Sequence, residues 1–258
     1  MVWQVLFHYH VMKQNVISNT PGGRTIARQT NHDSLLVERM IKTIIFDFGR
    51  VISEQKPPSL FSSYEEDLGL QPDTINSIMF DSQAWQDALL GRKTFEEFWQ
   101  TIGPLLGLKT PEAIEAFHRR YHGDEAINTG LLRLLHRLHG RFKLAILSNS
   151  PPGLLEWLVD WKIHHLFDVV FCSGDEGIVK PDPAAFQIIL QRLDVEPEEA
   201  VFIDDTIDHV LAARMHGLRG IRFTTAQSLE EELGLLLESE GDGNEKTNGS
   251  ASKGNDQT

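Results

Sequence analysis

The sequence predicts an α/β fold, a three-layer sandwich built on a mainly parallel sheet, with a small inserted helical cap. Short apolar runs that end in polar or small residues recur along residues 43–224, and segments with apolar residues at helical spacing lie between them. Runs without polar alternation are typical of strands that are covered on both faces. Their alternation with helices indicates parallel strands joined by right-handed crossovers.

Five runs are expected to form the strands, the last being the weakest. They are TIIF before Asp47, FKLAILSNS, FDVVFCSG, EAVFIDDT and RGIRF. The segments PPGLLEWLVDWKIHHLF and DPAAFQIILQRL between them have helical spacing. Pro181, Asp182 and Pro183 open the second of these segments with a helix-start signal.

Residues 54–130 interrupt this alternation, because they have helical patterns throughout, with glycines and prolines between them. A helical block after the first strand and before the second predicts a small cap over the carboxyl edge of the sheet. We therefore assign residues 40–53 and 131–240 to the core domain and 54–130 to the cap. The four tryptophans at helical spacing are expected to pack in apolar cores. They are Trp85, Trp99, Trp157 and Trp161.

Composition limits the function classes. The chain has 258 residues, 41% of them hydrophobic, which is enough for a proper core. The net charge of −13 and the lack of a Lys/Arg-rich run argue against nucleic acid or a membrane as partner. The single cysteine, Cys172, excludes an internal disulfide, and a reducing, cytoplasmic location is expected. No stretch approaches the roughly 18 apolar residues that span a bilayer.

The two ends differ from the middle of the chain. Residues 1–39 carry no acid before Asp33 and many Ser, Thr and Asn, so they are either a disordered leader or a targeting segment, which would make the location mitochondrial. Met40 directly precedes the first strand and is a second possible start. Residues 241–258 contain no large apolar residue and are expected to be a disordered tail.

The polar residues that end the strands are the candidates for chemistry, because ligands of open parallel sheets bind outside the carboxyl ends of the strands. Three carboxylates gathered there repel one another unless a cation is present, and Lys180 alone does not balance them. Mg²⁺ fits, since it binds one or two carboxylates together with water and substrate phosphate. One carboxylate aimed at phosphorus is the arrangement that aspartyl-phosphate chemistry requires. The candidates are Asp47, Ser148, Asn149, Lys180, Asp204 and Asp205.

In order and approximate spacing, these residues resemble the motifs of the haloacid dehalogenase superfamily over about residues 41–232. The resemblance implies a Rossmann-like core and the helical type of cap. It identifies Asp47 in IIFDFGRVI as the nucleophile. It also identifies Ser148 in LAILSN, with Asn149, and Lys180 in GIVKPDPAAF as the groups that bind the phosphoryl oxygens.

The same resemblance implies a magnesium site. Its ligands would be the carboxylate of Asp47, the main-chain carbonyl of Gly49 and an acid of the pair in VFIDDT, most simply Asp205 with help from Asp204. Asp208 would steady these ligands from the next helical turn. The expected activity is hydrolysis of a small phosphorylated metabolite through an aspartyl-phosphate; the natural substrate and the oligomeric state stay open.

Gly49 departs from the family pattern. Phosphatases of the family usually carry a second aspartate there, which protonates the leaving group, and such an acid contributes about 10²–10⁴-fold. One reading is a substrate whose leaving group needs little protonation, as in the Asp-x-Gly-x-Val subset that resembles sugar-1-phosphate phosphatases. Another is a proton donor from the cap. The candidates for that donor are Asp81, Glu97, His118 and His122.

Two further alternatives remain. In one, catalysis is impaired and the protein is a binding or regulatory module. In the other, the protein is a 2-haloacid dehalogenase. That class also lacks the second aspartate, but its members typically have a tyrosine at that position and use no metal. The presence of Gly49 and of the intact acidic pair makes this alternative the weaker one.

Overall fold

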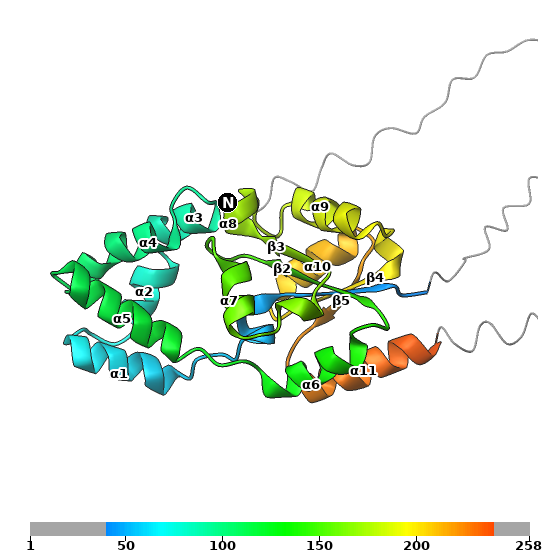
Figure 1. Cartoon of the computed structure of the whole chain (residues 1–258), viewed down its shortest axis with the longest axis horizontal. Helices are drawn as coiled ribbons and strands as arrows, with labels where there is room; N and C mark the ends of the chain where they lie inside the picture. Colours follow the sequence, from blue (N-terminus) through cyan, green and yellow to red (C-terminus); the bar gives the residue numbers. More distant parts are fainter. Residues whose placement is uncertain (1–39, 240–258) are drawn as a thin grey trace, which may run out of the picture. The chain divides into compact units, whose positions relative to one another are not determined.

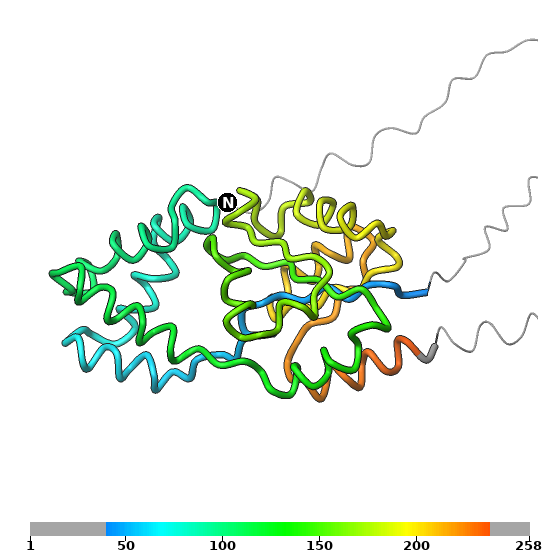
Figure 2. Tube along the Cα trace, in the orientation of Figure 1, coloured from blue at the N-terminus to red at the C-terminus, as the bar shows by residue number. Residues whose placement is uncertain are grey.

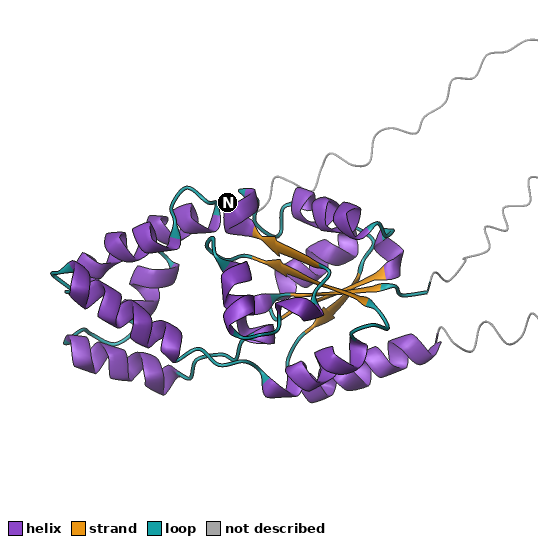
Figure 3. Ribbon diagram, viewed as in Figure 1, coloured by secondary structure: helices purple, strands orange, loops and turns teal. Residues whose placement is uncertain are grey.

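The computed structural model describes residues 40–239, so the predicted leader and tail lie outside the described residues. The predicted three-layer α/β fold is confirmed: a five-stranded sheet in the order β3-β2-β1-β4-β5 lies between helices (Figures 1 and 3). All four strand pairings are parallel. The strands are β1 Thr43–Phe46, β2 Lys143–Ser148, β3 Val169–Cys172, β4 Ala200–Asp204 and β5 Arg219–Arg222. Because β1 is central, the residue that follows it lies in the middle of the carboxyl edge.

The buried strands alternate between the two faces of the sheet. Ile44 joins an apolar cluster on the side of α6, α7 and α11, whereas Ile45 joins a separate cluster on the side of α9 and α10. Both isoleucines are fully buried. Burial of such a side chain contributes about 1.5–3 kcal/mol, and it explains why the strands read as apolar runs. The helices of this part are α6 Thr129–Leu138, α7 Leu154–Asp160, α8 Ser173–Glu176, α9 Pro183–Leu193, α10 Ile207–Met215 and α11 Ala226–Ser239.

Between β1 and α6, five α-helices follow one another in the chain and share an apolar cluster of their own, which includes Trp99. We call residues 58–123 the helical insert. Thr94 and Glu97 form a reciprocal capping box that starts α4. No helix among residues 40–239 is long and apolar enough to cross a membrane. The helices of the insert are α1 Pro58–Leu68, α2 Thr74–Phe80, α3 Gln83–Leu89, α4 Phe95–Ile102 and α5 Pro111–Gly123.

Three short 3₁₀ helices and one irregular turn complete the described elements. The turn, η1, directly follows Asp47 and is not regularly helical at Gly49 and Arg50. Its bounds are Phe48–Ile52, and the 3₁₀ helices are η2 Gly103–Leu106, η3 His164–Leu166 and η4 Pro197–Glu199. Because η1 begins immediately after β1, the chain turns away from the sheet at the point where the site is expected.

Two chain segments connect the insert to the sheet, as the chain trace in Figure 2 shows. They pair with each other, since the Glu54 amide donates to the Ala126 carbonyl at 2.7 Å and the Asn128 amide to the Ile52 carbonyl at 2.9 Å. The insert also approaches the core where Gly91 lies against Gly174: a Cβ built on Gly91 would lie 2.1 Å from the Gly174 carbonyl oxygen. Only glycine permits this approach, which holds the insert beside the carboxyl edge of the sheet.

We expect the stability of the protein to fall below neutral pH because of His122 in the insert. Burial, with smaller contributions from the charges of His118 and Lys56, lowers the pKa of His122 from 6.5 to about 3. The unfolded chain takes up this proton at pH 6.5 and the folded chain does not, so the stabilisation is complete above pH 6.5 and is lost as the pH falls toward 3. Between pH 6.5 and 4.5 the free energy of unfolding should fall by up to about 2 kcal/mol from this group, because solvent around the part of the ring that is not buried weakens the effect.

Urea unfolding at several pH values measures this effect. His122→Phe should flatten the pH dependence. His165→Phe, at an exposed histidine, is the matched control and should leave the slope unchanged. An unaltered slope in His122→Phe would contradict the assignment.

Candidate active site

The ends of β1 and β4 bring two buried carboxylates to one lysine. Lys180 Nζ lies 2.8 Å from Asp47 Oδ1 and 2.7 Å from Asp204 Oδ2. Burial alone would lower the pKa of Lys180, but the two carboxylates raise it above its ordinary value. Removing one partner from such a buried set leaves an uncompensated charge, so the three groups depend on one another.

Asn149 holds the lysine in place. Its side-chain Nδ2 donates to the Lys180 carbonyl at 2.9 Å, and its Oδ1 accepts from the Lys180 amide at 2.7 Å. The sequence predicted Asn149 as a substrate-binding group; the structure shows both side-chain amide atoms engaged by the backbone of Lys180. Asn149 thus positions Lys180 through contacts that join the end of β2 to the loop before α9.

The carboxylate of Asp204 has two polar partners besides Lys180. Its Oδ1 accepts from the Thr206 amide at 2.8 Å, and its Oδ2 lies 3.0 Å from His209 Nδ1. Burial alone would raise the pKa of Asp204, but the hydrogen bonds from His209 and Lys180, together with the charge of Lys180, lower it to about 2. The sequence predicted that Asp208 steadies the acids of the metal site. The structure instead shows Asp208 exposed, and its neighbour on α10, His209, in contact with Asp204.

Asp205 faces a different cation. Its Oδ2 lies 3.0 Å from Arg50 Nε, at the edge of the site where the arginine side chain is about half exposed. Arg50 adopts a left-handed conformation with φ 60° in the turn after Asp47. A non-glycine residue there carries a strain of about 1–2 kcal/mol. Nothing in the sequence indicated the pairing of Arg50 with Asp205.

The carboxylates form a group that fits a hard divalent cation. One oxygen each of Asp47, Asp204 and Asp205 lies within 4.8 Å of the others. Among the described residues, the lysine and arginine side chains that pair with these three acids are Lys180 and Arg50; they leave one negative charge over when His209, which contacts Asp204, is neutral. Burial also raises the pKa of the Asp47 carboxyl, and the charge of Lys180 opposes that rise. Oxygen donors with an excess of negative charge are the ligand set that Mg²⁺ prefers.

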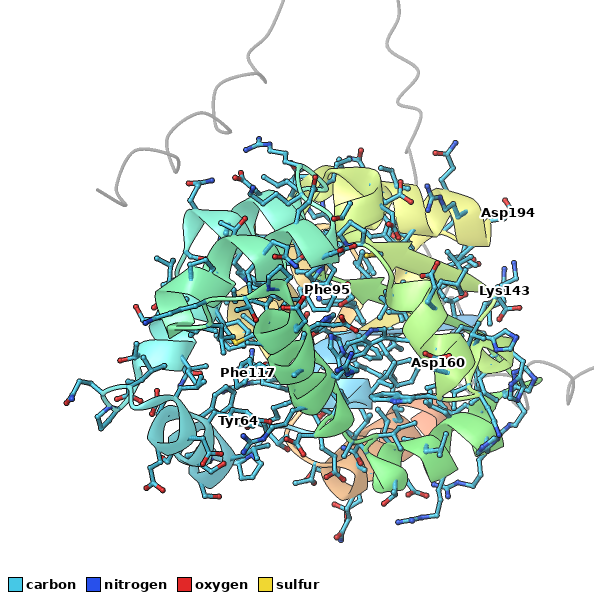
Figure 4. The ribbon with its side chains drawn as sticks, turned by 60° about the vertical axis from the view of Figure 1, so that its left-hand side comes forward. Tyr64, Phe95, Phe117, Lys143, Asp160 and Asp194 are labelled. Carbon is cyan, nitrogen blue, oxygen red and sulfur yellow. The ribbon has the colours of Figure 1, made fainter. Side chains whose placement is uncertain are left out.

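A cavity of about 580 Å³ opens from these residues toward the insert. Asp47, Ser148 and Lys180 line one end of it, together with Gly49 and Arg50. Ser148 is nearly buried, and its hydroxyl makes no hydrogen bond to another described side chain or carbonyl. The other end is formed by side chains of the insert, among them Phe95, which Figure 4 labels on the part of the insert that meets the core.

Gly49 has room for a side chain. Its φ is −66° and its ψ 127°, which any residue adopts, and a Cβ there would meet no atom within 4 Å. The proton donors proposed from the insert do not take its place, because none of them lines the cavity among the described residues. These are Asp81, Glu97, His118 and His122. Burial lowers the pKa of both His118 and His122, so at neutral pH both rings are uncharged and lack the extra proton that a general acid donates.

The tryptophans pack against the apolar clusters as expected, and two of them also line the cavity. Trp99 is buried in the insert and Trp161 packs against the core cluster, whereas Trp85 and Trp157 are half-buried and line the cavity as well. Helical spacing does not distinguish a core from a cavity wall, because both are covered by apolar side chains. The hydrophobic lining was therefore not predictable from periodicity.

Comparison with known proteins agrees with this geometry. A family model described as haloacid dehalogenase-like hydrolase matches residues 8–217. A sesquiterpene phosphatase of Aspergillus oryzae is 27% identical over 201 residues, which cover 76% of this chain and 96% of that protein. A drimenol cyclase of Aspergillus calidoustus is 26% identical over 201 residues, which cover 75% of this chain; the match spans only 36% of the cyclase.

A solved structure shares the fold. It is a haloacid dehalogenase family enzyme of Bacteroides thetaiotaomicron, an Asp-to-Ala mutant in complex with magnesium and inorganic phosphate. The TM-score is 0.60 at 19% identity, with 72% of this chain and 95% of the other covered. The family match covers most of the chain, and the site residues lie within it. The chain belongs to the haloacid dehalogenase-like hydrolase family.

Proposed function

We propose that the protein is a Mg²⁺-dependent phosphohydrolase that acts on a small phosphate monoester through an aspartyl-phosphate on Asp47. The observation that carries this proposal is the position of Asp47. It is a nearly buried carboxylate at the centre of the carboxyl edge, it contacts the ammonium of Lys180 at 2.8 Å, and it lines the cavity. The phosphatase among the relatives and the magnesium–phosphate complex among the solved structures support the same reaction class.

The carboxylate of Asp47, the main-chain carbonyl of Gly49 and the carboxylate of Asp205 would hold the metal ion. Asp204 is the less available acid, because Lys180, His209 and Thr206 already donate to it. When bound, Mg²⁺ supplies positive charge that offsets the phosphoryl oxygens and the clustered carboxylates.

The residues of the chain then have distinct tasks. A carboxylate oxygen of Asp47 attacks phosphorus, so that an O–P bond forms and the ester P–O bond breaks. Lys180 and the free hydroxyl of Ser148 donate hydrogen bonds to the phosphoryl oxygens. Water then attacks the same phosphorus, which releases phosphate and restores the carboxylate of Asp47.

Gly49 limits the leaving group. The oxygen of the organic part departs without a proton from position 49, and the candidate acids of the insert are not among the described residues that line the cavity. Substrates whose leaving oxygen is stable as an anion are therefore favoured, namely acyl, aryl or anomeric phosphates. The insert acts as a cap that keeps bulk water from the site between the two steps.

Phosphate release from phenyl phosphate tests the proposal. Activity should appear with Mg²⁺, vanish with EDTA and return when Mg²⁺ is restored. Asp205→Asn should raise the Mg²⁺ concentration for half-maximal rate by roughly tenfold or more, because a ligand loses its charge. Asp208→Asn, an exposed neighbour, is the matched control and should behave as the wild type.

A different outcome identifies the main competitor. A protein that releases no phosphate from acyl, aryl or anomeric esters, and still binds inorganic phosphate, would be a binding module and not a hydrolase.

A further inference from the structure

Aromatic side chains line the cavity from the nucleophile to the insert, and we call Phe48, Trp157, Phe95, Trp85 and Phe80 the aromatic wall; Phe98 behind the lining contacts both Phe95 and Trp85. Phe48 directly follows Asp47, and its ring centroid lies 6.0 Å from that of Trp157. Trp157 lies 6.5 Å from Phe95, which belongs to the insert. Phe95, Trp85 and Phe80 line the cavity farther on, and Trp85 lies 5.4 Å from Phe80. The wall thus joins the core and the insert and begins beside the residue that would carry the phosphoryl group.

Away from Asp47, three charged side chains line the same cavity, namely Glu54, Lys56 and Glu125, and two of them pair with each other. Lys56 forms an ion pair with Glu125, and its ammonium lies 4.3 Å from the centre of the Tyr121 ring. Gln55 and Asn76 are the amides that remain in this part of the lining. A polyhydroxylated ligand would bury many hydroxyls with few partners, and each unpaired group opposes binding.

We infer that the organic part of the substrate is apolar: a phosphate ester of a hydrocarbon or aromatic body that lies along the wall from Phe48 to Phe80. This inference rests on the proposed function, because it places the phosphoryl group at Asp47. Large apolar lining with a few convergent polar groups is the usual design of a site for such ligands. Among the esters with a stable leaving anion, aryl phosphates are therefore expected to be better substrates than the anomeric phosphates of sugars, and phosphorylated polyols are expected to be poor substrates.

The test uses a series of substrates in which the apolar part varies and the leaving group is always a phenolate. Phosphate release is measured for phenyl phosphates with para-alkyl chains from methyl to hexyl, and for a phenyl phosphate with a para-glucosyloxy group. The kcat/KM should rise by about fourfold for each added methylene until the cavity is filled. The glucosylated ester should be slower than the hexyl ester by at least a factor of about 100.

Two variants report on the wall itself. Phe80→Ser should reduce the dependence on chain length, whereas Leu105→Ser, at an exposed leucine of the insert, should not change it. The dependence on chain length is a ratio of kcat/KM values measured on one preparation, so a partial loss of folded protein does not affect it. Alkylphosphonates of increasing length, which are not hydrolysed, give the same series as dissociation constants through the fluorescence of Trp85 and Trp157, which line the cavity.

The outcomes separate this inference from the proposed function. Tighter binding of longer phosphonates without any phosphate release would overturn the proposed hydrolase and support the apolar site. Phosphate release that is equal for all chain lengths, or fastest for the glucosylated ester, would overturn the apolar site and leave the hydrolase in place.

Discussion

Replacing Asp47 with asparagine lowers the rate of phosphate release from phenyl phosphate by about 10⁴-fold or more, as expected when a nucleophile is removed. Asparagine has nearly the same shape, but its amide does not form the acyl-phosphate bond. Lys180 keeps its contact with Asp204 at 2.7 Å, so the buried cation is not left without a partner. The loss should therefore appear in kcat and not in folding.

Two measurements accompany the rate. Mass spectrometry of acid-quenched wild-type enzyme should show the mass of one phosphoryl group added at Asp47, and the variant should show none. Asp194→Asn is the matched control, because Asp194 is exposed and left-handed at the end of α9, where asparagine is equally suited. Retention of activity within tenfold in Asp47→Asn would show that another group attacks phosphorus.

Replacing Gly49 with aspartate raises kcat/KM for alkyl phosphates by about 10²-fold or more and changes that for aryl phosphates little. The physical reason is that an alkoxide leaves slowly without a proton, whereas a phenolate needs little help. The backbone at Gly49 is extended, and a Cβ there meets no atom within 4 Å, so the carboxyl is accommodated without repacking.

Matched substitutions isolate the proton. Gly49→Ala adds only a Cβ atom, and Gly49→Asn adds a side chain with the shape of aspartate that is not an acid. Neither substitution should therefore accelerate the hydrolysis of the alkyl esters. The ratio of alkyl to aryl kcat/KM is the readout. An equal gain for both ester classes, or the same gain with asparagine, would refute leaving-group protonation as the missing step.

The sheet was predictable from the sequence because its strands are buried on both faces. Ile44 and Ile45 are both fully buried although they point to opposite sides, and this makes β1 read as a continuous apolar run. Polar residues at the ends of such runs must meet at one edge of a parallel sheet. The meeting of Asp47 with Asp204 follows from that rule, and the loop before α9 brings Lys180 to both of them.

The remaining features depend on packing between distant segments. The ion pair of Arg50 with Asp205 and the contact of His209 with Asp204 are set by the turn after β1 and by the rotation of α10, which residue spacing leaves undetermined. The aromatic wall requires the insert to lie beside the core. That placement depends on the approach of Gly91 to Gly174, which no periodic pattern reveals.

The open space beside Gly49 also bears on how such a site changes over generations. Every glycine codon lies a single base from a codon for aspartate or glutamate. Because a side chain at this position meets no neighbouring atom within 4 Å of its Cβ, an acid can arise there without any compensating substitution. Packing therefore does not restrict residue 49 to glycine. Natural selection for substrates with a particular leaving group can change this residue directly.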